Sequence, residues 1–339
     1  MKRFLTYTFS LLLSAGLLAL ALRGVRFDEV WTSLETAHYV WLLPVVVFML
    51  TGHAFRAWRW KLQLDHLPEV RFEGRTIAFR NPFYAVLISY MVNSILPRVG
   101  EVVRVENVAR QEKLSFTGVL GTVVADRTSD VLILGLGFLS LFPLAADKLL
   151  ATWQEYITPF LNRTLGGQNL WLLDVVMTVG LLGLIGGFFW LRKHPESRIA
   201  NMIQAFKAGF ITIYATPQKA QLMLSTFGIW FSYVLIVLFS AWMLGMRGWT
   251  LTDSWVLMVI GSLGMAAPTP GGVGSYHIVI RWALTTLWHV PDETAVAFAV
   301  FTHASQLIVY AVAGSISLIL QGSSFLDVFR FGKTSPSAT

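Results

Sequence analysis

Cysteine is absent from the 339-residue sequence, and charged residues are scarce. Without cysteine, the chain cannot form a disulfide, an iron–sulfur cluster, a thiolate zinc site or a cysteine nucleophile. A Gly-rich Walker loop for nucleotide phosphates is also missing. Charged residues make up 13% of the chain and hydrophobic residues 55%, and the mean hydropathy is +0.61. A water-soluble domain could not cover its surface with this composition, so the sequence predicts an all-α, polytopic membrane protein.

Long apolar runs predict six helices that cross the membrane, because about 20 apolar residues span a hydrocarbon core. These runs are residues 4–22, 39–60, 116–142, 170–191, 222–246 and 294–320. The first run could instead be a signal peptide, but further apolar runs follow it and favour a retained helix. Two shorter pieces, 82–96 and 254–267, end at proline and glycine, which predicts re-entrant, broken helices. Residues 199–213 have the spacing of an amphipathic helix on the membrane surface.

In this topology most lysines and arginines lie on the cytoplasmic side of the membrane. This distribution accounts for the net charge of +7 without nucleic acid as a partner. Segments assigned to the cytoplasm hold 19 of the 26 lysines and arginines, and the outer segments hold six. The positive-inside rule then predicts an inner-membrane protein with cytoplasmic N- and C-termini. Residues 1–322 form one membrane domain in this interpretation, and 323–339 form a polar cytoplasmic tail.

The order of crossing, short piece, break and long crossing occurs twice, at about 39–142 and again at about 222–320. On the charge argument, the first short piece enters from the cytoplasm and the second from outside, so the sequence predicts an inverted repeat. Paired, interrupted helices of this kind indicate a transporter binding site near the membrane midplane. The alternative is a pair of helical hairpins kinked by proline and packed through glycine.

Three charged residues interrupt the predicted crossing 116–142: Asp126, Arg127 and Asp130. Their spacing places the two carboxylates on one helix face with the arginine beside them. An ion at the bilayer centre costs at least ~2.5–3.5 kcal/mol on insertion scales, so this trio must face protein or water. Arg127 is then a candidate for binding an anionic headgroup, with the carboxylates neutralising it between cycles. The alternative is a structural ion-pair cluster.

The first break is followed by a charged segment that supplies a second group of candidates. Asn93, Arg98, Glu101 and Arg104 lie around Gly100, whose lack of a side chain allows close backbone approach. Glu101 and the two arginines could form a gate or a phosphate clamp. Taken alone, these charges could equally belong to a solvated loop.

The second break supplies a glycine-rich turn and nearby aromatic and polar residues. The candidates are Gly271, Gly272, Gly274, Tyr276 and His277 at the break, with His303 and Gln306 in the last crossing. Backbone amides in such a turn suit an anion. A single histidine in a membrane helix is more often a hydrogen-bond partner between helices. The two histidines have no third zinc ligand at usable spacing, and we expect no metal or cofactor.

These motifs together resemble the lysylphosphatidylglycerol-synthase transmembrane family of flippase-like membrane proteins. The matching segments are Asn93 with Leu96-Pro97-Arg98-Val99-Gly100-Glu101 and Arg104, then Asp126-Arg127 with Asp130, then Pro268-Thr269-Pro270-Gly271-Gly272-Val273-Gly274. The resemblance covers nearly the whole chain and implies movement of a lipid headgroup between leaflets along the matched polar residues. Many relatives carry glutamate where this chain has Asp126, which keeps the charge. The soluble aminoacyl-transferase domain of the synthase members is not present in this sequence, so we expect no aminoacylation and no enzymatic activity.

Three functional hypotheses follow from the sequence. The first is a flippase-like transporter for a lipid with a charged or glycosylated headgroup. The second is a non-transporting accessory subunit for a lipid-modifying enzyme, with that enzyme or a second copy of the chain as a partner besides membrane lipid. The third is an intramembrane hydrolase in which Ser275 pairs with His277 or His303.

Overall fold

The computed structural model describes residues 2–96, 98–152 and 217–323, together with residues 154, 155, 159 and 190. Its residues divide into two compact units, one made of Met1–Arg127 and Gln218–Thr339 and the other of Thr128–Pro217. The predicted crossing 170–191, apart from residue 190, the surface helix 199–213, Pro97 and the tail beyond residue 323 lie outside the described residues. Within the described ranges the regular structure is entirely helical.

The helices follow the apolar pattern of the sequence. Those of the first unit are α1 (Lys2–Ala21), α2 (Phe27–Glu35), η1 (Tyr39–Trp41), α3 (Leu42–Leu64), α4 (Pro68–Phe72), α5 (Arg80–Ile95), α6 (Val99–Glu112), α11 (Lys219–Met243), α12 (Leu251–Ala266), η3 (Pro270–Gly272), α13 (Ser275–Trp288) and α14 (Asp292–Leu320). Helix α7 (Phe116–Thr152) begins in the first unit and continues into the second. It contains Pro143, and its backbone leaves helical geometry at Ala145.

Four helices in the described part of the chain are long and apolar enough to cross a membrane: Tyr39–Leu64, Phe116–Lys148, Lys219–Met243 and Asp292–Leu320. They coincide with four of the predicted crossings. Ser10–Ala21 and Leu251–Ala266 are shorter apolar helices. The fold is therefore a helical, multi-pass membrane bundle, as the composition predicts.

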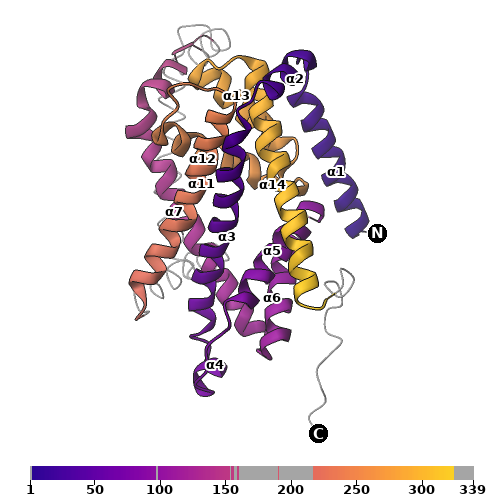
Figure 1. Cartoon of the computed structure of the whole chain (residues 1–339), viewed down its shortest axis with the longest axis vertical. Helices are drawn as coiled ribbons and strands as arrows, with labels where there is room; N and C mark the ends of the chain where they lie inside the picture. The colour runs from indigo at the N-terminus through magenta and orange to yellow at the C-terminus, as the bar shows by residue number, and fades with distance from the viewer. Residues whose placement is uncertain are drawn as a thin grey trace. The chain divides into compact units, whose positions relative to one another are not determined.

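Two helical hairpins approach each other from opposite ends of the first unit. Helices α5 and α6 form the lower hairpin in Figure 1, and α12 and α13 form the upper one. The chain reverses at left-handed residues, Arg98 (φ 66°) in the lower hairpin and Gly271 (φ 58°) and Gly272 (φ 83°) in the upper. A left-handed residue ends a right-handed helix, and glycine adopts it without steric cost.

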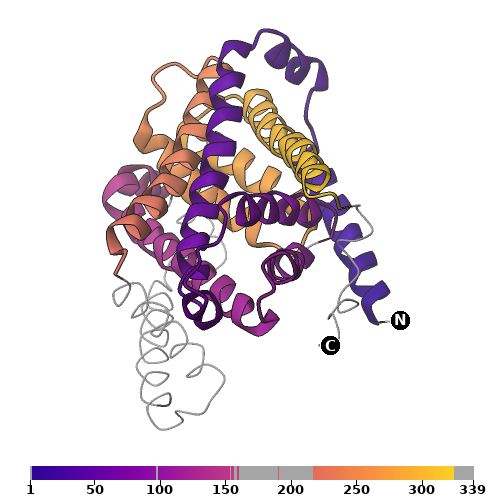
Figure 2. The ribbon, with the colours of Figure 1, turned by 60° about the horizontal axis from the view of Figure 1, so that its bottom comes forward.

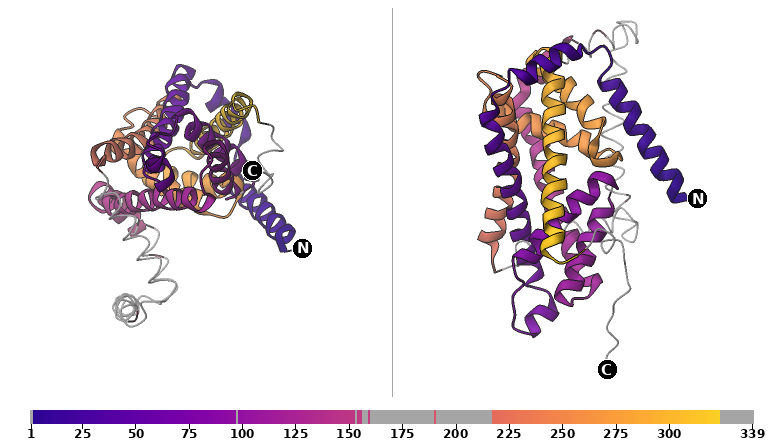
Figure 3. Two further views of the ribbon diagram at one scale, coloured as in Figure 1. Left: turned by 90° about the horizontal axis from the view of Figure 1, so that it is seen from below. Right: turned by 45° about the vertical axis from the view of Figure 1, so that its right-hand side comes forward.

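The tips of the two hairpins are in contact (Figure 3). A methyl group at Gly271 would lie 3.5 Å from the Cα atom of Ser94 and 3.7 Å from its carbonyl oxygen. Both hairpins also pack on long helices, since α5 contacts α3 and α14 (Figure 2) and α13 contacts α14 and α1. Ser10 and Ser14 of α1 donate hydrogen bonds to the carbonyls of Pro268 and Val273. The two breaks are thus held against each other inside the bundle.

Hydrogen bonds identify which segments share an end of this unit. At one end, Arg281 donates to the carbonyl of Ala21 at 2.5 Å and pairs with Asp292, while Arg26 pairs with Glu293 at 2.7 Å. At the other end, Asn107 of α6 donates to Gln321 after α14 at 2.9 Å. The first end gathers Arg23, Arg26 and Arg281, three of the six basic residues that the sequence assigns to the outside.

Candidate functional site

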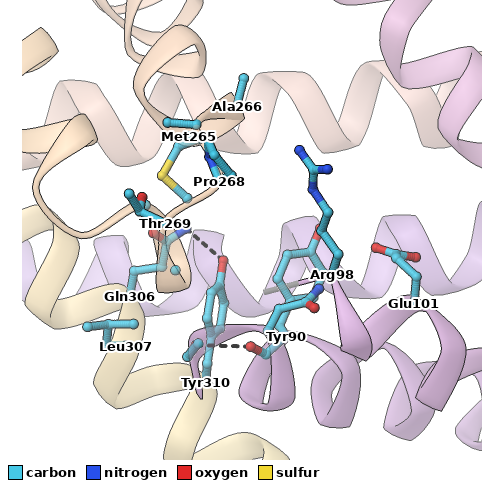
Figure 4. Close-up of a pocket in the computed structure, with 15 residues that line it drawn as sticks. Tyr90, Arg98, Glu101, Met265, Ala266, Pro268, Thr269, Gln306, Leu307 and Tyr310 are labelled. Atoms are coloured by element: carbon cyan, nitrogen blue, oxygen red, sulfur yellow. Dashed lines mark hydrogen bonds between the residues drawn. The ribbon is translucent and has the colours of Figure 1, made fainter. Parts of the chain in front are cut away.

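A cavity of about 230 Å³ lies where the two hairpin tips meet (Figure 4). Arg98 and Glu101 lie on one side, and Met265, Pro268 and Thr269 on the other. The described residues that line it are Tyr90, Asn93, Ser94, Arg98, Glu101, Met265, Ala266, Ala267, Pro268, Thr269, Gly271, Gly272, Gln306, Leu307 and Tyr310. Six of the candidates named from the sequence therefore contribute to one cavity: Asn93, Arg98, Glu101, Gly271, Gly272 and Gln306.

Asn93 and Gly100 fix the lower tip. The Asn93 side-chain oxygen accepts the backbone N–H of Gly100 at 2.8 Å and so satisfies a donor at the start of α6. A methyl group at Gly100 would lie 2.1 Å from the carbonyl oxygen of Ser89, which no packing adjustment of side chains could relieve. The segment after the break is a helix packed closely on α5, and this turns Arg98 and Glu101 toward the cavity.

Helix α14 supplies a polar wall through Gln306 and Tyr310. The Gln306 amide donates to the Tyr310 hydroxyl at 2.7 Å. The Tyr310 ring lies 5.0 Å from that of Tyr90 and 5.2 Å from that of His53, and the Tyr90 and His53 rings are 4.5 Å apart. His53 is buried on α3, one turn before Arg56. Aromatic and polar groups therefore continue from the cavity into the bundle.

Arg127 forms an ion pair with Glu101 across α6 and α7. The Nη2 atom of Arg127 lies 2.5 Å from Oε1 of Glu101, and both side chains are about one-third exposed. The second carboxylate oxygen, Oε2 of Glu101, is buried and accepts no hydrogen bond from the described residues. A carboxylate that lines the cavity therefore holds one buried oxygen without a donor among the described residues.

Asp126 lies at the centre of a buried arginine cluster. Arg59 contacts its Oδ1 through Nη2 at 2.7 Å and Nε at 2.8 Å, and Arg104 contacts its Oδ2 at 2.9 Å. Arg56 approaches Oδ2 at 3.6 Å and donates to the hydroxyl of Tyr233 at 3.2 Å. All four charged side chains are at most 3% exposed. Charge buried this deeply needs partners of opposite sign or a bound ion.

Arg56 and Arg59 are functional candidates that the sequence interpretation missed. The run from Phe55 to Lys61 is rich in tryptophan and arginine, which suggests an interfacial belt with basic anchors. That interpretation is wrong for these two residues, because their side chains point into the bundle and contact Asp126. Their separation by three residues, which places both on one helix face, was the available signal. Arg104 is likewise fully buried rather than part of a solvated loop.

Arg104 retains unused hydrogen-bond donors. Its guanidinium stacks over the Trp60 ring at 4.2 Å, and Trp60 donates to Thr122 at 2.8 Å. Within the described ranges, the Nε and Nη1 groups of Arg104 have no hydrogen-bond acceptor. An arginine that contacts one aromatic ring and one carboxylate keeps some of its five guanidinium N–H donors without an acceptor.

Asp130 belongs to the second compact unit. Its place beside the cluster therefore remains a prediction from the helical spacing of α7, which puts it one turn beyond Asp126 on the same face.

The remaining candidates gather around the upper break, outside the cavity lining. The His277 and His303 rings stack at 4.9 Å, and Tyr276 meets His303 edge-on at 5.6 Å. Tyr276 shares a hydrogen bond with Thr302 at 3.1 Å. Gly274 (φ 84°) packs on α1, since a methyl group there would lie 2.6 Å from the carbonyl oxygen of Ser14. This group joins α13 to α14 and α1.

The Ser275 hydroxyl is engaged by the upper break itself. It donates to the carbonyl of Gly264 at 2.6 Å and lies 3.0 Å from the Thr269 hydroxyl. His277 instead accepts the backbone N–H of Gly274 through Nδ1 at 3.4 Å. Ser275 thus ties α13 to α12, and this geometry gives the hydrolase hypothesis no activated nucleophile.

Residues 7–314 match the sequence profile of the family described as "Lysylphosphatidylglycerol synthase TM region". A comparison with curated proteins finds no similar sequence. The family match indicates a membrane role related to lipid, in agreement with the apolar helices of the bundle. Because the match spans nearly the whole chain, this protein belongs to the lysylphosphatidylglycerol synthase transmembrane family.

Proposed function

We propose that the protein is a flippase-like transporter that moves a lipid with a charged or glycosylated headgroup between the leaflets of the inner membrane. The observation that carries this proposal is the cavity, lined in part by charged and polar side chains, between the tips of two hairpins that approach from opposite ends of the bundle. A headgroup crossing hydrocarbon loses its hydration and needs polar partners along the way. Irregular backbone at membrane depth is tolerated only where protein or a cavity covers it.

In this proposal α5–α6 and α12–α13 are re-entrant hairpins of an inverted repeat. The α4 end of the bundle and both chain termini face the cytoplasm. Arg23, Arg26 and Arg281 lie together at the opposite end. They are three of the six basic residues that the sequence assigns to the outside, which supports this orientation. Each leaflet would then reach the cavity past one hairpin, as in transporters built from inverted repeats.

The Glu101–Arg127 pair acts as the exchangeable contact in this mechanism. An anionic headgroup that enters the cavity replaces Glu101 as the partner of Arg127, and Glu101 takes the arginine back when the headgroup leaves. Oε2 of Glu101 accepts a hydroxyl of a glycerol or sugar headgroup. Arg98 lies on the same side of the cavity, and Asn93, Gln306 and the backbone of Gly271 and Gly272 complete its polar surface. The buried ion pair of Arg104 and Asp126 joins α6, which carries Glu101, to α7, which carries Arg127.

Reconstitution in liposomes tests the proposal. A fluorescent lipid in the inner leaflet becomes accessible to a membrane-impermeant quencher only after it crosses the bilayer. We expect Arg127→Ala to slow this step about 10- to 100-fold, the effect of losing a hydrogen bond to a charged group. Arg71→Ala removes the same charge from the exposed face of α4 and serves as the matched control. Equal rates for the wild type, Arg127→Ala and protein-free liposomes would refute transport.

A further inference from the structure

We propose that His303, stacked on His277, binds a proton that couples lipid translocation to the pH difference across the membrane. This inference rests on the proposed function, because it assumes that a lipid crosses between the hairpin tips. It assigns a role to a buried pair of histidines outside the headgroup cavity and names the proton as the coupling ion.

The two histidines join the upper hairpin to the last long helix. His277 lies on α13 and His303 on α14, and their rings stack at 4.9 Å with 28° between the ring planes. Both residues are buried, with 8% and 2% of their surface exposed. Histidine changes its charge near neutral pH, and histidines inside membrane helices take part in the proton relays of pumps and transporters. A buried pair of this kind is therefore a candidate proton site.

His303 is the member of the pair that can accept the proton. The backbone of Gly271 interacts with its ring electrostatically, but within the described residues neither ring nitrogen completes a hydrogen bond. A neutral imidazole has one N–H donor and one acceptor nitrogen, and leaving both buried without partners costs free energy. In contrast, Nδ1 of His277 accepts the backbone N–H of Gly274. The incoming proton therefore binds the free lone pair of the His303 ring.

The titratable groups around His303 are few in the described part of the chain. His277 acts on it directly, and Tyr276 of α13 meets its ring edge-on at 5.6 Å. Arg281, one turn after His277, is paired with Asp292 of α14. The adjoining parts of α1, α12 and η3 contribute uncharged residues, and the charged side chains of the headgroup cavity lie on the lower tip. Two adjacent imidazolium rings would repel each other, so the pair binds a single proton.

The histidine pair is adjacent to two cavities. On α14, Gln306 follows His303 by one turn and lines the headgroup cavity. On α13, Ile278 and Arg281 follow His277 and line a second cavity of about 330 Å³ between α1, α13 and α14. This second cavity is at the end that the proposed orientation assigns to the outside. Water that enters it supplies the proton.

Proton binding is linked to movement of the upper hairpin. An imidazolium that is buried without hydration is unfavourable, so a proton on His303 favours an arrangement in which α13 separates from α14 and water reaches the ring. When α13 packs on α14 again, the proton returns to water. Gly271 and Gly272 belong to the same hairpin and line the headgroup cavity. Proton and lipid therefore bias one moving element, which couples their binding.

Phosphatidylcholine liposomes that contain the full-length protein test the coupling. Phosphatidylglycerol with a fluorescent label is the probe, and potassium with valinomycin holds the membrane potential at zero. If one proton moves per lipid, a difference of one pH unit supports up to about tenfold more probe in one leaflet than in the other. We expect the wild type to build this asymmetry and His303→Gln, which cannot bind the proton, to distribute the probe evenly. His38→Gln changes an exposed histidine and should keep the asymmetry.

Spin labels on the two helices report the movement without any lipid transport. Trp282→Cys on α13 and Ile308→Cys on α14 place labels at exposed positions of a chain that has no other cysteine. We expect the distance between the labels, measured by pulsed electron paramagnetic resonance, to increase when the pH falls from about 8 to about 5. The same pair of labels with His303→Gln should keep one distance at both pH values. An unchanged distance in the wild type, or a response that persists in His303→Gln, would overturn the proton site.

The outcomes separate the coupling from transport itself. If the probe crosses but spreads evenly under the pH difference, the coupling is wrong and the transport proposal stands. An asymmetry that persists in His303→Gln assigns the proton to another residue and also overturns this site. If the protein moves the probe no faster than protein-free liposomes do, the transport proposal fails, and the label distances alone decide whether His303 binds a proton.

Discussion

Replacing Asp126 by asparagine should strongly destabilise the protein. Asp126 is fully buried, and the Arg56, Arg59 and Arg104 side chains around it are at most 3% exposed. The substitution keeps the size of the side chain but leaves three buried guanidinium groups without the carboxylate they share. Breaking a buried ion pair by removing one partner costs about 3–5 kcal/mol, and we expect a loss in this range.

Reversible unfolding in mixed micelles, followed by circular dichroism, measures this loss. Glu73→Gln is the matched control, because the Glu73 side chain is 56% exposed and its ion pair with Arg75 should contribute less than about 1 kcal/mol. Combining Asp126→Asn with Arg59→Gln removes charges of both signs, so the double variant should be more stable than the sum of the single effects predicts. A loss below about 1 kcal/mol for Asp126→Asn, or strictly additive effects, would refute the reasoning.

Two further predictions concern packing and orientation. Gly100→Ala should destabilise the bundle by roughly 1–3 kcal/mol through overpacking, because the new methyl group meets the backbone of Ser89. The same change should abolish translocation. Gly121→Ala is the control: its methyl group would meet open space, so it should change neither stability nor translocation. Unfolding and liposome assays on both variants check this, and an undisturbed Gly100→Ala would contradict the packing. Phe72→Cys, which replaces a 94% exposed side chain on α4, should react with a membrane-impermeant maleimide only from the cytoplasmic side, and Arg247→Cys only from outside. Labelling of both from one side would contradict the orientation.

Length and hydropathy were sufficient to predict the long helices and their breaks. The predicted crossing 294–320 differs from α14 by two residues at its start, and the predicted piece 82–96 differs from α5 by one or two at each end. These boundaries are local, because Pro97 and Pro291 lie just outside the two helices and proline disfavours a helix across it. The helix α13 after the second break was not predicted, since Gly271 to Gly274 indicated only a turn.

The ion pairs of the site could not be predicted in the same way. The sequence predicted that Asp126 faces protein or water, and it is buried in protein, but the arginines that bind it come from α3 and α6, 67 and 22 residues away. Those contacts depend on how α3 and α6 pack against α7. Arg56 and Arg59 also stand in a segment rich in aromatic residues, and the same residue types serve as interfacial anchors in other membrane proteins.

The measurement that tests the central claim most directly is a reversible cross-link between the two hairpin tips. Ser94→Cys with Gly271→Cys places the new thiols within reach of a disulfide, because the β-carbon position at Gly271 lies 3.5 Å from the Cα atom of Ser94. The natural chain has no cysteine, so it provides a silent background. We expect the pair to cross-link in membranes, lipid translocation to stop, and reduction to restore it. Failure to cross-link, or full translocation by the cross-linked protein, would contradict a headgroup path between these tips.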